Sequence, residues 1–108
     1  MINKEERTLD LYKQVGAEWR LYKEIRARLL VDASKVLTAP EQDKLLRACG
    51  RTDEVCSRAD DHMFHDHPEV DNTYVDVFYG TLHGEPRTAV DAEVVSLARS
   101  VADSLFGE

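Results

Sequence analysis

The sequence predicts an all-α protein, a single domain in which about four helices form an antiparallel bundle with an unusually long first helix. Apolar residues recur at steps of three and four over most of the chain, which is the period of an amphipathic helix. Pro40, Pro68 and Pro86 divide the chain into four segments. The 108 residues suffice for one hydrophobic core but not for two, so the domain spans residues 1–108.

The first predicted helix covers residues 3–37. Such a helix is roughly 50 Å long at 1.5 Å per residue, whereas a compact domain of this size has a radius of gyration of about 13 Å. The helix must therefore kink, extend beyond the rest of the domain, or pair with another chain, and Gly16 is the expected place for a kink or a close helix contact. Its apolar stripe consists of Leu9, Tyr12, Val15, Trp19, Tyr22, Leu29, Leu30, Ala33 and Leu37.

The second predicted helix covers residues 40–66. Thr38 is placed to cap its first turn, and Glu41 completes a capping box three residues later. Pro68 disfavours helical geometry in the residue before it, so the helix should end near residues 65–67. Cys49 and Cys56 would lie about 10 Å apart along this helix, which is too far for a disulfide, and we expect both to be small buried residues.

The third and fourth predicted helices cover residues 71–83 and 88–106. Residues 73–79 favour a strand by composition but also fit helical spacing, and because no second strand is evident we predict a short helix ending at Gly84. Thr88 and Asp91 signal the start of the last helix, which should end at Gly107.

Charge is distributed unevenly along the chain. Residues 59–86 carry seven acidic residues, no Lys or Arg, and all four histidines, whereas residues 1–58 have a net charge of +2. This acidic segment argues against direct binding of nucleic acid. It suggests instead that Asp60, Asp61 and Asp66 face a protein partner, which could be basic, as in an inhibitor that imitates nucleic-acid phosphates.

The stretch DDHMFHDHPEVD, at residues 60–71, offers a second interpretation. His62 and Asp66 lie one helical turn apart, a spacing that can supply two ligands to zinc or another divalent metal. A closed site needs further ligands, and the spacing matches no established metal motif. A metal site, a pH-responsive patch and a solvated helix end without a role of its own all remain open, and no cofactor is required.

The first helix carries a third set of candidate residues. Arg26 interrupts the apolar stripe one turn after Tyr22 and two turns after Trp19. Its guanidinium either reaches a carboxylate on a neighbouring helix or, together with the two aromatic residues, anchors a dimer or partner interface.

These observations predict a small acidic protein-interaction or regulatory module that forms a homodimer. The sequence contains no catalytic signature, so we do not expect an enzyme. A metal-binding protein and an enzyme with a carboxylate site between helices are the alternatives. No stretch approaches the roughly 18 apolar residues of a membrane span, and the charged segment MINKEERTLD does not resemble a signal peptide, so we expect a cytoplasmic protein without membrane contact.

Overall fold

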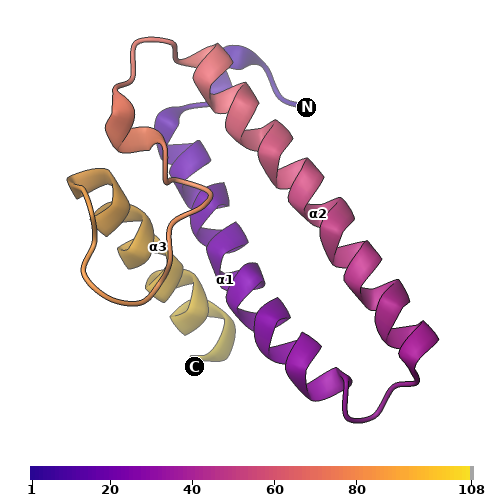
Figure 1. Cartoon of the computed structure of the whole chain (residues 1–108). Helices are drawn as coiled ribbons and strands as arrows, with labels where there is room; N and C mark the ends of the chain where they lie inside the picture. The colour runs from indigo at the N-terminus through magenta and orange to yellow at the C-terminus, as the bar shows by residue number, and fades with distance from the viewer. Residues whose placement is uncertain (108) are drawn as a thin grey trace.

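The computed structural model describes residues 1–107, and all of its regular structure is helical (Figure 1). Three α-helices, α1 (Leu9–Ala33), α2 (Ala39–Asp66) and α3 (Ala89–Phe106), are accompanied by two 3-10 turns, η1 (Lys4–Glu6) and η2 (Asn72–Tyr74). The described residues contain no strand. The all-α class is confirmed, but the structure has three helices where the sequence predicted about four.

Helices α1 and α2 form an antiparallel hairpin whose ends are fixed by capping threonines (Figure 1). Thr8 Oγ1 accepts a hydrogen bond from the Leu11 amide at 3.1 Å, so α1 begins at Leu9, and Lys4–Glu6 form the separate turn η1. The predicted range of 3–37 was therefore too long at both ends. The predicted capping box is confirmed, because the Thr38 amide donates to Glu41 Oε1 at 2.9 Å while Thr38 Oγ1 accepts from the Glu41 amide.

The hairpin is longer than the rest of the domain. The molecule measures 47 × 30 × 27 Å and has a radius of gyration of 15.5 Å, above the roughly 13 Å of a compact chain of this length. Helix α3 runs beside α1 and ends before the hairpin does (Figure 1). Of the outcomes expected for a long first helix, the structure shows an extension beyond the neighbouring elements.

The predicted helix at 71–83 is wrong: η2 and a series of turns occupy this segment. Two basic side chains of α1 bind its backbone carbonyl groups and hold it in irregular form. Arg20 donates to the carbonyl oxygens of Asp76, Val77 and Thr81, and Lys23 donates to that of Phe78 at 3.0 Å.

Close approach of the backbone also fixes this segment on α1. A Cβ at Gly16 would lie 2.7 Å from both the Cγ1 atom and the carbonyl oxygen of Val77, so only glycine leaves room for the contact. The chain then turns at Gly84, whose φ of +75° lies in the region that favours glycine. Gly16 is thus a site of close contact, one of the two roles expected from the sequence.

The core lies where α1, α3 and the irregular segment meet. Val77 and Phe78 are buried there, beside residues of all three helices. Helix α3 is capped as predicted, with Thr88 Oγ1 accepting from the Asp91 amide at 3.0 Å. The other buried core residues are Tyr12, Ala17, Cys56, Met63, Val90, Val94 and Ala98.

Within residues 1–107, none of the helices has the length and apolar content needed to cross a bilayer.

Candidate functional site

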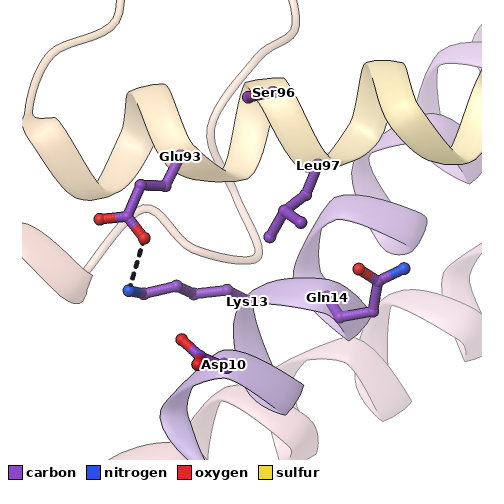
Figure 2. Close-up of a pocket in the computed structure, with 6 residues that line it drawn as sticks. All are labelled: Asp10, Lys13, Gln14, Glu93, Ser96 and Leu97. Atoms are coloured by element: carbon purple, nitrogen blue, oxygen red, sulfur yellow. Dashed lines mark hydrogen bonds and ion pairs between the residues drawn. The ribbon is translucent and has the colours of Figure 1, made fainter.

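A polar groove of about 500 Å³ lies between the first turns of α1 and the middle of α3 (Figure 2). The Lys13 side chain crosses this groove, and its Nζ atom forms an ion pair with Glu93 Oε2 at 2.7 Å. Burial of Lys13 opposes its charge, but the hydrogen bond to Glu93 and the nearby Tyr74 ring outweigh this, and the pKa of Lys13 is raised. The Lys13 ammonium is therefore held as a cation in a structural pair and is a poor proton donor or nucleophile. The groove is lined by Asp10, Lys13, Gln14, Glu93, Ser96 and Leu97.

Asp66, a candidate for both metal and partner binding, is part of an internal cluster. Its Oδ2 atom accepts from Arg7 Nε at 2.6 Å and from the Tyr12 hydroxyl at 2.5 Å, and only 3% of its side chain is exposed. The hydrogen bonds from Arg7 and Tyr12 hold the pKa of Asp66 far below its usual range. Both of its oxygens are engaged, since Arg7 Nη2 also donates to Oδ1 at 3.0 Å.

The histidines near Asp66 do not gather around a common point. His62 and His65 are exposed on α2, and the His67 ring lies 2.7 Å from the carbonyl oxygen of Arg7. Among the residues that the structure describes, no group of three or more His, Cys, Asp or Glu side chains is arranged to hold a metal ion. His62 and Asp66 thus have no third ligand beside them in residues 1–107.

Asp60 is half-buried, and its Oδ1 atom has no hydrogen-bond partner within the described chain, whereas Asp61 is exposed. Burial and the neighbouring charge of Asp61 raise the pKa of Asp60 to about 6, although Lys23 acts in the opposite direction. This carboxylate destabilises the fold when it is ionised.

The acidic segment is less exposed to partners than its composition suggests. Arg7 neutralises Asp66, and Arg87 lies 3.5 Å from Asp76. Both basic residues lie outside residues 59–86, so their pairing with this segment could not be predicted from the sequence.

Trp19, Tyr22 and Arg26 lie on the side of α1 that faces α2. Arg26 forms an ion pair with Asp53 of α2 at 2.7 Å and also donates to the carbonyl oxygen of Cys49. The prediction that Arg26 reaches a carboxylate on a neighbouring helix is confirmed. Trp19 is half-buried, whereas Tyr22 is 39% exposed and its hydroxyl lies 3.1 Å from Thr52 Oγ1.

A further candidate surface is a row of residues on α1, only some of which belong to the apolar stripe predicted from the sequence. We define the α1 seam as Leu11, Val15, Glu18, Tyr22, Ile25 and Leu29. At 100° per residue these positions fall within about 80° of the helix circumference. The exposed fractions of Ile25 and Leu29 are 56% and 51%, although both lie in the interior of a well-formed helix.

Shallow grooves flank the α1 seam on both sides. One, of about 320 Å³, lies toward α2 and is lined by Val15, Glu18, Trp19, Tyr22 and Thr52. The other, of about 330 Å³, lies toward the end of α3 and is lined by Glu18, Leu21, Tyr22, Ile25, Val101 and Leu105. Most of these lining residues are apolar, so the surface can bind another apolar surface but contains little that could perform chemistry.

No protein-family model, curated protein or solved structure matches this chain.

Proposed function

We propose that this chain is a helical protein-interaction module whose docking surface is the α1 seam. The observation that carries the proposal is the exposure of Ile25 and Leu29 on the same side of α1 as Tyr22 and Leu11. Single exposed apolar residues are ordinary, but Tyr22, Ile25 and Leu29 follow one another on one side of α1, and a contiguous exposed apolar patch is typical of a surface that another protein covers.

The arrangement of the fold supports this proposal. Helix α2 and α3 both pack on α1, and Lys13, Arg20 and Arg26 bind residues of these neighbours. None of these ion pairs lies on the α1 seam, although Tyr22 at its border also contacts Thr52 of α2. Tyr22 belongs to a residue type that contributes strongly to protein interfaces, and the aliphatic members of the seam can be buried around it.

The acidic segment at residues 59–86 supports the proposal less than the α1 seam does. An inhibitor that presents carboxylates to a basic partner needs them unpaired, and Asp66 and Asp76 already lie beside arginines. We also propose a cytoplasmic location, which the free and buried thiols of Cys49 and Cys56 support, because such thiols are typical of reducing compartments.

Site-specific photo-crosslinking in the cells that produce the protein tests this function. A photoreactive amino acid at Leu29, on the α1 seam, should give a covalent adduct with a protein. The matched control is Val31, which is 62% exposed on the opposite side of the same helix and should give none. Equal adduct yields at the two positions, or no adduct at Leu29, would contradict the proposal.

A further inference from the structure

The α1 seam has the spacing of a coiled-coil interface. Its members follow one another at steps of 4, 3, 4, 3 and 4 residues, which is the repeat of the a and d positions in a heptad. The seam runs from Leu11 to Leu29, almost the whole of α1 (Leu9–Ala33). A helix with this repeat on an uncovered side is shaped to pack lengthwise against another helix.

One member of the α1 seam is charged. Glu18 interrupts the apolar row, lines both flanking grooves and forms no ion pair within residues 1–107. A carboxylate in a covered interface requires a cation, because an unpaired buried charge is costly. The partner surface must therefore present a basic group opposite Glu18.

The same helix carries such a group. Arg28 is exposed, lies beside the α1 seam next to Leu29, and likewise has no ion-pair partner in the described part of the chain. If two copies of α1 pack antiparallel, the symmetric register that places Tyr22 opposite Ile25 also places Glu18 opposite Leu29. Arg28 of the second copy then lies beside Glu18, and the two-fold axis repeats the pair.

A parallel arrangement lacks this complementarity. It would place Glu18 directly opposite Glu18 of the second copy, and like charges in a covered seam repel each other. The charge pattern thus favours the antiparallel register.

The register sets how much of α1 is covered. Placing Tyr22 opposite Ile25 makes residues 14–33 of the two copies overlap, a length of about 30 Å at 1.5 Å per residue. The contact therefore runs from Val15 to Leu29 and leaves Leu11 at its edge.

We infer that the chain forms a symmetric homodimer in which two α1 helices pack antiparallel through the α1 seam, with Glu18 of each copy paired to Arg28 of the other. This inference rests on the proposed function and names the occupant of the same surface.

A charge exchange tests the register, with the dimer dissociation constant measured by sedimentation for the full chain at low salt. Glu18→Arg and Arg28→Glu should each raise that constant at least tenfold, because each creates two like-charge contacts per dimer. The double variant E18R/R28E should return it to within about threefold of the wild-type value. Both residues are exposed, and melting curves of the variants should match that of the wild type.

The possible results separate the inference from the proposed function. Absence of rescue in the double variant, or a protein that stays monomeric at every concentration, overturns the inference. An adduct at Leu29 with a protein of different mass likewise overturns it but leaves the proposed function standing. Lack of any adduct at Leu29 together with a dimer that Leu29→Lys does not weaken contradicts both. Val31→Lys serves as the control and should leave the dissociation constant unchanged.

Discussion

Removing the guanidinium of Arg20 should destabilise the fold more than any other single change of a polar side chain. Arg20 is 1% exposed and forms an ion pair with Asp91 at 2.6 Å. It also donates to carbonyl oxygens of the segment at 76–81, including that of Val77 at 3.0 Å. Arg20→Met keeps most of the side-chain volume but leaves Asp91 buried with a single remaining donor to its other oxygen, the Arg87 amide at 2.9 Å.

The expected loss follows from these contacts. Breaking a buried ion pair by removing one member costs about 3–5 kcal/mol, and the released carbonyl groups add to this unless water reaches them. We expect a loss of about 4–5 kcal/mol in the free energy of unfolding, or a fall in melting temperature of roughly 15–20 °C. Such a loss is a large part of the total stability of a domain, about 5–15 kcal/mol.

The pH dependence of the stability loss tests whether the unpaired Asp91 carboxylate causes it. Burial opposes ionisation of Asp91, but the Arg87 amide and the Arg20 guanidinium outweigh it and hold the pKa of Asp91 below its ordinary value. In wild type this stability is present above about pH 4 and is lost as the pH falls further. Without Arg20 the buried carboxylate favours its protonated form, so the deficit of Arg20→Met should shrink as the pH falls from 7 toward 4.

Chemical denaturation at pH 7 and pH 4 of the two single variants, Arg20→Met and Asp91→Asn, and of their double variant checks this reasoning. The double variant should lose about 1–3 kcal/mol less than the sum of the two single losses. A loss below about 1 kcal/mol for Arg20→Met, or strictly additive losses, would refute the role given to this pair.

Four further substitutions test other contacts by thermal melting. Thr38→Ala should lower the free energy of unfolding by about 1 kcal/mol because the capping box is lost, and an unchanged melting temperature would argue against it. Asp60→Asn should stabilise the protein by roughly 1 kcal/mol above pH 6 and should have no such effect below pH 4. The raised pKa of Asp60 means that the native state binds the proton more tightly than the unfolded state does, so the ionised carboxylate is destabilising only at the higher pH. A gain in stability that does not depend on pH would contradict this. Gly50→Ala should raise the free energy of unfolding by about 1 kcal/mol, because alanine favours a helix more than glycine does. The free energy of unfolding of Gly16→Ala should be about 1–3 kcal/mol lower than that of Gly50→Ala, because the new Cβ meets Val77 at 2.7 Å. Similar melting temperatures for the two variants would disprove the close contact.

Local signals in the sequence predicted the helix ends well. Thr38 with Glu41 and Thr88 with Asp91 mark starts that depend on contacts three residues apart, and the structure forms both caps. Short-range patterns of this kind are visible without knowledge of the fold.

The segment at 71–83 could not be predicted in the same way. Its apolar spacing fits a helix, but its conformation depends on Arg20 and Lys23, which lie more than fifty residues earlier in the chain. Nothing in the sequence shows that two basic residues of α1 will bind these carbonyl groups. Tertiary hydrogen bonds therefore outweighed local preference.

The partners of the candidate site residues could not be predicted for the same reason, since they are distant in the sequence. Asp66 was singled out because His62 stands one turn before it, whereas its actual partners, Arg7 and Tyr12, lie 59 and 54 residues away. Ile25 did not belong to the stripe recognised in the sequence, because α1 has apolar residues on more than one side. Only the positions of α2 and α3 show which of these sides remains uncovered.

The central position of α1 has a consequence for how the protein opens. Helices α2 and α3 each pack on α1, and Figure 1 shows them on different sides of it. Either outer helix can separate while the other keeps its contact with α1, so native-state hydrogen exchange should resolve two partial openings of different free energy. The amides of α1 are protected in both, and they should exchange only when the whole chain unfolds.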